Sequence, residues 1–181
     1  MKLVKLEEGV FEIDAFLPVE ECDSLIALSE AIGFKQADVQ TLSGRQLLTN
    51  IRNNERVDYL SNTLAKVYWQ KIAELNLPIC EGKNAIGISS NFRFYKYQLG
   101  QKFSMHRDGR QSIGENETLY TLLVYLNEDC IGGETFFREG NLKVLLKKGL
   151  AIIFEHSLWH QGVDVKSGVK YVLRSDIVYG E

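Results

Sequence analysis

The residues of this chain best suited to metal chemistry are few and distinctively spaced. His106, His156 and His160 are its three histidines, and His106 forms an HxD pair with Asp108. Residues two apart on an extended strand point to the same face, so this imidazole and this carboxylate would converge on one point. A distant histidine could complete a triad of two histidines and one carboxylate, which leaves adjacent coordination positions open on Fe(II) for oxygen chemistry. Because HxD pairs are common by chance, the pair alone is weak evidence.

A downstream segment strengthens this interpretation. His160 stands in LWHQG, directly after the apolar run LAIIF, and Lys170 follows ten residues later in GVKYVLRSD. A long cationic side chain beside a metal is suited to hold the distal carboxylate of a dicarboxylic acid. The two residues therefore add a candidate third ligand and a candidate anion-binding group to the HxD pair.

Before residue 85 the spacing of apolar residues is largely helical, so helices are expected in this part of the chain. Pro18 suits the first turn of a helix, whose apolar residues at helical spacing are Cys22, Leu25, Ile26 and Ile32. A second helix is predicted with Asp58 as its cap, and its apolar face comprises Leu60, Leu64, Val67, Tyr68, Ile72 and Leu75. Pro78 stands just past the end of that helix. We therefore expect residues 1–84 to be mainly helical support.

From residue 85 onward, short β-rich runs alternate with turn signals such as Gly132-Gly133, which indicates a tight turn. The expected strands are Ser90–Tyr97, Thr118–Asn127, Thr135–Phe137, Leu142–Leu146, Leu150–Phe154 and Lys170–Tyr179. Apolar residues crowd together in Thr118–Asn127, as expected for a strand buried on both faces. Helices followed by many strands predict an α+β fold: an antiparallel double-stranded β-helix, or jelly roll, over 85–181, braced by N-terminal helices. No linker divides the chain, so one domain over 1–181 is expected.

The composition excludes several other classes. The net charge of −3 gives no reason to expect a nucleic-acid or anionic-membrane partner. The three cysteines are widely spaced and form no CxxC, which argues against a disulfide framework or a zinc knuckle. Glu7 and Glu8 fall where a signal peptide would be apolar, and no apolar run approaches the length of a membrane span. We expect a cytoplasmic protein.

The segment from Phe92 to Tyr179 resembles the catalytic core of the 2-oxoglutarate/Fe(II) dioxygenase superfamily, in its prolyl-4-hydroxylase-like branch. The matching pieces occur in family order with family-like spacing: FRFYKYQLGQKFSMHRDG, TLLVYLNEDCIGGETFF and KKGLAIIFEHSLWHQGVDVKSGVKYVLRSD. IDAFLPVEECDSLI is similar to the opening helix of that branch. The likeness covers nearly the whole chain and is weakest between residues 33 and 85.

This resemblance implies that His106, Asp108 and His160 bind Fe(II). Lys170 would pair with the C5 carboxylate of the cosubstrate 2-oxoglutarate, and Tyr97 matches a tyrosine that supports the cosubstrate; the other explanation for Tyr97 is a core aromatic. The implied reaction consumes O₂, releases succinate and CO₂, and hydroxylates an unactivated C–H bond, with a prolyl residue as one possible target. Ascorbate is an optional further cofactor. Asp108 favours hydroxylation, because related halogenating enzymes lack this carboxylate.

Two residues compete for roles near this site. His156 lies fourteen residues before Lys170 rather than ten and directly follows a strand end, so we assign it a supporting or structural role. Arg174, four residues past Lys170, shares its strand face and could contact the cosubstrate, salt-bridge a substrate, or be purely structural. The alternative function is a cupin-like metal-binding or sensor module without 2-oxoglutarate turnover, which gives no reason for Lys170.

The substrate is left open between a peptide or protein and a small molecule, and so is the oligomeric state. Two polar segments, Leu48–Arg56 and Gly109–Glu117, lack core periodicity and are expected to border the substrate site, either as a closing lid or as plain surface loops. In the resembled branch, an arginine-containing segment comparable to the first one borders the substrate channel.

Overall fold

The computed structural model describes residues 1–41, 43–46, 48 and 50–181, and its helices are α1 (Val19–Ile32), α2 (Asn62–Ile72) and the 3-10 turn η1 (Glu139–Asn141). The strands before residue 90 are β1 (Leu3–Glu7), β2 (Val10–Ile13), β3 (Lys35–Gln36), β4 (Val39–Thr41), β5 (Gly44–Gln46), β6 (Glu55–Leu60) and β7 (Asn84–Ile88). Those after it are β8 (Asn91–Tyr97), β9 (Phe103–His106), β10 (Ser112–Ile113), β11 (Asn116–Tyr125), β12 (Ile131–Gly132), β13 (Thr135–Phe137), β14 (Leu142–Val144), β15 (Ala151–Glu155), β16 (His160–Gly162), β17 (Val165–Ser167) and β18 (Lys170–Gly180).

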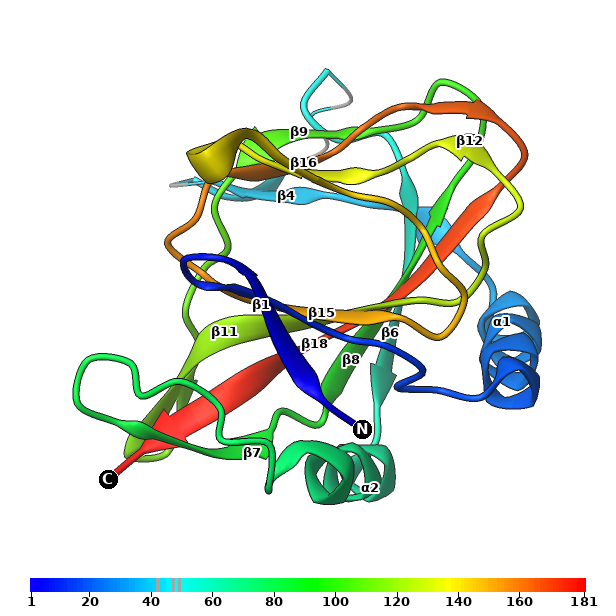
Figure 1. Ribbon diagram of the computed structural model, residues 1–181. Coiled ribbons are helices and arrows are strands. Elements are labelled where there is room, and N and C mark those ends of the chain that lie inside the picture. Colours follow the sequence, from blue (N-terminus) through cyan, green and yellow to red (C-terminus); the bar gives the residue numbers. More distant parts are fainter. Residues whose placement is uncertain (42, 47, 49) are drawn as a thin grey trace.

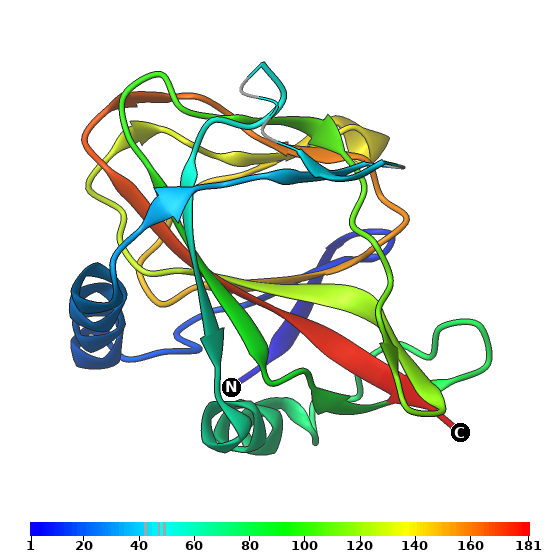
Figure 2. The ribbon, with the colours of Figure 1, turned by 180° about the vertical axis from the view of Figure 1, so that it is seen from behind.

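Two antiparallel sheets form the body of the molecule (Figure 1). The larger sheet has the order β1-β2-β15-β11-β18-β8-β6-β3, with β10 beside β11 and β7 beside β18. The smaller sheet has the order β14-β13-β16-β9 and lies above the larger one in Figure 1. The pairs β12-β17 and β4-β5 complete the described strands. Seen from behind in Figure 2, α1 and α2 again lie beside and below the larger sheet, away from the smaller one. The predicted α+β class with an antiparallel jelly-roll core is confirmed.

Side-chain alternation along the central strands creates two cores, one on each face of the larger sheet. Phe94 of β8 and Leu173 of β18 belong to the core shared with the helices. Tyr95 and Tyr97 of β8, with Val172 of β18, belong to the core between the two sheets. Because residues two apart share a strand face, β8 and β18 each supply a row of side chains to the space between the sheets.

The expectation that residues 1–84 are mainly helical is wrong outside the two helices, because β1 to β6 occupy much of this region. These strands are short, and tertiary pairing holds them: β2 pairs with β15, and β6 pairs with β8. Local periodicity carries little trace of such pairing. The first helix does follow Pro18 as expected, with Cys22 and Leu25 buried.

The second helix begins later than predicted. Its cap is Ser61, whose side chain accepts a hydrogen bond from the amide of Leu64. Asp58 lies in β6 instead, as does Leu60, which is exposed rather than part of an apolar face. A serine three residues before an amide donor is the stronger cap, since its hydroxyl satisfies an otherwise unpaired helical N–H. None of the described helices is long and apolar enough to cross a membrane.

The strand predictions beyond residue 85 agree closely with β8, β11, β13, β14, β15 and β18. The central run of β11 is buried on both faces, with Leu122 in the helix-side core and Tyr125 between the sheets. Gly132 and Gly133 adopt φ of 78° and 76°, the left-handed conformation that a tight turn of glycines permits. The strands β7, β9, β10, β12, β16 and β17 were not among those expected from the sequence.

Candidate metal centre and adjoining pocket

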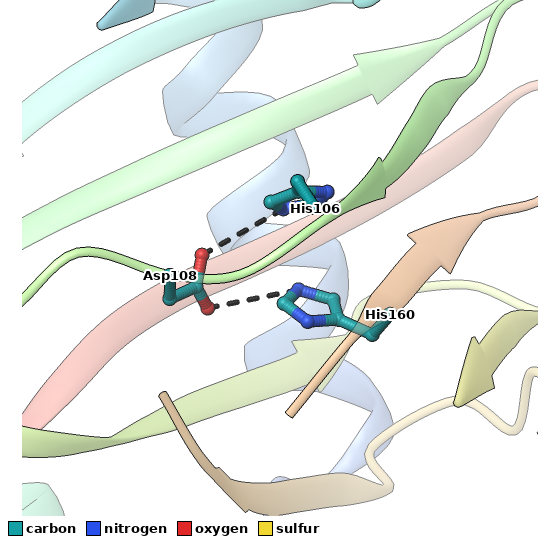
Figure 3. Close-up of side chains that lie close together, drawn as sticks. All are labelled: His106, Asp108 and His160. Carbon is teal, nitrogen blue, oxygen red and sulfur yellow. Dashed lines mark ion pairs between the residues drawn. The ribbon is translucent and has the colours of Figure 1, made fainter. Parts of the chain in front are cut away.

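The structure brings together His106, Asp108 and His160. His106 ends β9 and His160 begins β16, and the two are direct partners in the antiparallel register of these strands. Their ring centroids lie 4.3 Å apart. Ligand atoms of the three side chains lie within 4.8 Å of one another, and Figure 3 shows them pointing toward a common centre. Cross-strand pairing therefore supplies the distant histidine that the HxD pair needs.

Backbone carbonyls orient both imidazoles. His106 Nδ1 lies 2.8 Å from the carbonyl oxygen of Ser104, and His160 Nδ1 lies 3.1 Å from that of Leu158. A carbonyl can only accept, so each Nδ1 carries a proton, and in the neutral ring Nε2 then presents a lone pair. Both Nε2 atoms lie 3.7 Å from Asp108 oxygens, His106 from Oδ1 and His160 from Oδ2. This tautomer is the one that a metal-binding histidine needs.

The Asp108 carboxylate is held by neighbours on the larger sheet. The Thr121 hydroxyl donates to its Oδ2 at 2.6 Å, and Arg174 Nη2 lies 3.2 Å from the same oxygen. Burial raises the pKa of Asp108, but Arg174, His160 and His106 outweigh it and hold the pKa well below the usual range. Burial lowers the pKa of His160 to about 4. At neutral pH the centre thus offers a carboxylate and a neutral His160 imidazole, which fits Fe(II) or another divalent metal.

A pocket between the sheets leads from these residues to Lys170, and it is lined also by Tyr97, Thr135 and Phe154. Lys170 is 2% exposed, and its amine donates to the carbonyl of Gly133. Within the described part of the chain, no carboxylate pairs with this lysine. Burial lowers its pKa to about 8. A buried cation without an anionic partner is costly, so it points to a ligand that supplies the anion.

Tyr97 lies directly opposite Lys170 in the register of β8 and β18, with the amine 4.9 Å from the ring centroid. Its ring lines the pocket as the sequence suggested, although it also belongs to the intersheet core. Burial raises the pKa of Tyr97, so its hydroxyl stays protonated. The contact with cosubstrate remains a prediction.

Arg174 shares the pocket face of β18 with Lys170, as the spacing of four indicated. Its guanidinium is already engaged, because Nη2 donates to Asp176 Oδ1 at 2.9 Å and contacts Asp108. These protein carboxylates favour the structural explanation over a direct cosubstrate contact, which stays a prediction.

His156 is buried beside the centre and is not one of the three converging side chains. Its carbonyl accepts a hydrogen bond from the amide of Asp108 at 3.2 Å, and its Nε2 lies 3.3 Å from Asp176 Oδ1. The first contact supports the HxD segment directly, and the second joins His156 to Asp176 of β18. They agree with the supporting role inferred from its position in the sequence.

An open groove adjoins the centre on its other side. Its lining includes Ile51, Arg52 and Arg56 from the first polar segment and Gly109, Arg110 and Gln111 from the second, so both segments border the same groove. Residue 49 of the first segment lies outside the described residues. That segment is no plain surface loop: Arg52 and Asn54 are buried, and β6 begins at Glu55. The second forms the hairpin of β10 and β11.

Sequence reasoning missed several side chains that shape the site, namely Tyr95, Phe103, Thr121 and Asp176. A signal existed for two of them. Tyr95 shares a strand face with Tyr97, and Asp176 shares one with Arg174, so the period of two could have added both. Phe103 and Thr121 reach the site only through sheet register, which no single segment encodes.

Comparisons with known proteins agree with this geometry. A structure of a viral collagen prolyl hydroxylase from Paramecium Bursaria Chlorella virus-1, in complex with 2-oxoglutarate, matches with a TM-score of 0.68 and 25% identity over 94% of this chain and 96% of that one. A Pseudomonas putida prolyl-4-hydroxylase matches at 0.71 with 17% identity, over 93% and 92%. A Trichoplax adhaerens prolyl hydroxylase in complex with a hypoxia inducible factor peptide matches at 0.73 with 15% identity, over 93% and 83%.

Sequence relatives point the same way. Probable prolyl 4-hydroxylase 11 of Arabidopsis thaliana is 28% identical over 144 residues, which are 75% of this chain and 48% of that protein. An uncharacterised protein of Fowlpox virus (strain NVSL) is 28% identical over 96 residues, 52% of this chain and 22% of that protein. The matches thus span about half and about a fifth of these relatives. The model of the Poxvirus C4/C10 protein family matches residues 32–180. The chain belongs to the Poxvirus C4/C10 protein family, and it has the 2-oxoglutarate/Fe(II) oxygenase fold with prolyl-4-hydroxylase-like structural neighbours.

Proposed function

We propose that this protein is an Fe(II)- and 2-oxoglutarate-dependent dioxygenase that hydroxylates an unactivated C–H bond. The observation that carries the proposal is Lys170, a buried cation that pairs with no carboxylate of the described residues and lies in a pocket that ends at the three converging side chains. A module that only bound a metal would have no use for this charge. A dicarboxylic acid anchored at both ends of the pocket accounts for both features.

Each residue then has a defined task. His106, Asp108 and His160 would hold the metal, with both Nδ1 atoms anchored on carbonyls. Bound Fe(II) would supply O₂ activation coupled to decarboxylation of 2-oxoglutarate to succinate and CO₂. Lys170 would bind the C5 carboxylate and fix the cosubstrate's orientation. Apolar walls such as Phe154 would exclude water from the pocket.

Anaerobic titration tests the cosubstrate directly. Fe(II) should give a visible metal-to-ligand charge-transfer band only when 2-oxoglutarate is added. Lys170→Ala should raise the 2-oxoglutarate requirement strongly, since loss of such a buried charge pair costs about 2–5 kcal/mol, while Fe(II) affinity changes little. Iron binding without the band, or a cosubstrate requirement unchanged by Lys170→Ala, would contradict the proposal and favour a simple metal-binding module.

Substitution of His156 and His160, which lie four residues apart, tests which residues bind the metal. His160→Ala should lose Fe(II) binding and turnover, as should the Ala variants of His106 and Asp108. His156→Ala is the matched control and should retain iron, because its contact with Asp108 uses the backbone carbonyl. The reverse pattern, with iron kept by His160→Ala and lost by His156→Ala, would show the assignment to be wrong.

The relatives named as prolyl hydroxylases make a prolyl residue the first C–H donor to test. A screen for substrate-dependent succinate formation against proline-containing peptides, free amino acids and cell extract would identify the substrate. If succinate formed at the same rate with and without these candidate substrates, the oxygenase proposal would stand, but a prolyl residue would no longer be supported as the substrate.

A further inference from the structure

A row of stacked side chains leads away from the metal centre. The ring of Phe103 lies on that of His106, with centroids 3.5 Å apart and an interplanar angle of 17°. The Arg52 guanidinium carbon lies 4.3 Å from the centroid of Phe103 and 4.4 Å from that of Tyr95. An isolated antiparallel bridge between Arg52 and Phe103 fixes this arrangement. The ring of Phe103 therefore connects the Arg52 guanidinium to His106, a candidate metal ligand.

Arg52 is poorly satisfied for a buried cation. It is 5% exposed; Nε donates to Asn54 Oδ1 at 2.7 Å, but Nη2 is buried and has no hydrogen-bond partner in the described part of the chain. Among the residues that the structure describes, no carboxylate pairs with it. Arg56 and Arg110, in the same groove, do pair, with Asp38 and with Glu81. A buried guanidinium nitrogen without an acceptor is unfavourable until a ligand provides one.

The position of Arg52 suits a substrate rather than the cosubstrate. It lines the open groove and is absent from the lining of the Lys170 pocket. Groove and pocket share Tyr95, Phe103, His106, Asp108 and Arg174, which therefore border the passage between them. Three arginines act on Tyr95 in this passage: burial raises the pKa of Tyr95, but Arg174, Arg52 and Arg93 outweigh it and lower the pKa to about 8.

We propose that Arg52 binds a carboxylate of the primary substrate, so that the molecule oxidised at this centre is acidic close to the reacting carbon. The inference rests on the proposed function and narrows its substrate class. A guanidinium packed against two rings is restrained, and the planar fork of its N–H donors matches the geometry of a carboxylate. The carboxylate can belong to a free amino or other organic acid, or to an acidic residue of a peptide.

Binding of matched acid and amide probes tests this without turnover. The protein is loaded with Zn(II) and 2-oxoglutarate, and probe affinity is measured by saturation-transfer NMR. One arm compares free amino acids, proline first, with their carboxamides; the other compares capped proline-containing peptides bearing Asp or Glu with the same peptides bearing Asn or Gln. We expect the acid to bind about tenfold or more tightly in one arm, which identifies its source.

The ratio of acid to amide affinity is then followed in three variants. Arg52→Gln should reduce the ratio to about one, and Arg52→Lys should keep part of it, because charge survives without the planar fork. Arg110→Gln also removes one positive charge from the groove. Because Arg110 is already paired with Glu81 and Glu117, the ratio should persist in this variant. Thermal unfolding confirms that each variant is folded.

Three results would overturn the proposal: wild-type protein without acid preference in either arm, no probe binding at all, or a preference that survives Arg52→Gln. A ratio lost equally in Arg110→Gln would also count against it, since general groove charge would then explain the preference. Failure of the oxygenase proposal looks different, because the charge-transfer band with Fe(II) and 2-oxoglutarate would be missing.

Discussion

Lys170 shows how a ligand site is built at the expense of stability. Its pKa is lowered from 10.5 to about 8 by burial, and among the described residues its amine contacts the carbonyl of Gly133 and two tyrosine rings. This pKa difference means that holding the charged amine in the ligand-free protein costs roughly 3 kcal/mol at neutral pH. A second carboxylate brought by the proposed cosubstrate, 2-oxoglutarate, would recover that free energy on binding.

The first prediction follows from this cost. Lys170→Met should raise the free energy of unfolding of the ligand-free protein by about 1–3 kcal/mol at pH 7, and 2-oxoglutarate should no longer stabilise the variant. The folded pKa lies below the unfolded one, so the unfolded state binds more protons between pH 8 and 10.5 and wild-type stability rises through that window. Urea unfolding at pH 7 and pH 10 measures both effects. A variant less stable than wild type at pH 7 would contradict the argument.

The second prediction concerns the pH dependence of cosubstrate affinity. The amine is charged below about pH 8 in the ligand-free protein, so 2-oxoglutarate affinity should fall as pH rises above that value, approaching tenfold per unit. Lys170→Arg keeps its charge and should give a flat profile over the same range. Titration calorimetry with Zn(II)-loaded protein from pH 6.5 to 9.5 provides the measurement. Equal slopes in the two proteins would assign the titration to another group.

At this scale the sequence was informative where chemistry depends on residue type and spacing. His106 and Asp108 drew attention by their spacing, and the resemblance to the dioxygenase superfamily implied that His160 and Lys170 belong to the same site. The stacking of Arg52 could not emerge, because it depends on a bridge to Phe103 about fifty residues away in the chain. The polar segment around Arg52 drew attention by composition, but burial and the missing acceptor are properties of the folded surroundings.

At the scale of elements, the part of the chain after residue 85 was predicted from its own sequence better than the part before it. Long strands such as β11 and β18 carry enough apolar residues to be recognised from their own sequence. Short strands such as β2 and β6 are specified by the partners they join, β15 and β8. Propensity is weak over a few residues and tertiary pairing overrides it, which is why the first part of the chain was wrongly expected to be mainly helical.

The connection into β15 provides a prediction for this scale. Gly149 has φ of 81°, and a Cβ there would lie 2.2 Å from the carbonyl oxygen of Leu17, two residues before the first helix. Gly149→Ala should therefore cost about 2–4 kcal/mol of unfolding free energy, from backbone strain plus a clash with a rigid backbone atom. Gly100 is the matched control: its φ is 74° and nothing lies within 4 Å, so Gly100→Ala should cost only about 1 kcal/mol. Denaturant titration compares the two, and equal losses would remove the steric part of the argument.

At the scale of the whole molecule, the metal centre lies where the two sheets meet. His106 and His160 belong to β9 and β16 of the smaller sheet, whereas Asp108 is held by Thr121 of β11 and Arg174 of β18 in the larger one. A metal bound by all three side chains would connect the sheets at this point. Metal binding should therefore act on the stability of the molecule and not only on its chemistry.

Hydrogen exchange can show this connection directly. Zn(II) at about 100 times its dissociation constant should raise the free energy of unfolding by about 2.7 kcal/mol, and EDTA should reverse the gain. Amides that open by local fluctuation in β9 and β16 should gain protection, whereas those in β1, at the far edge of the larger sheet, should change little. Asp108→Ala should lose both effects and His156→Ala should keep them. If Zn(II) stabilised Asp108→Ala as much as the wild type, the zinc would be bound elsewhere. If protection rose as much in β1 as in β9, the metal would not act locally where the sheets meet.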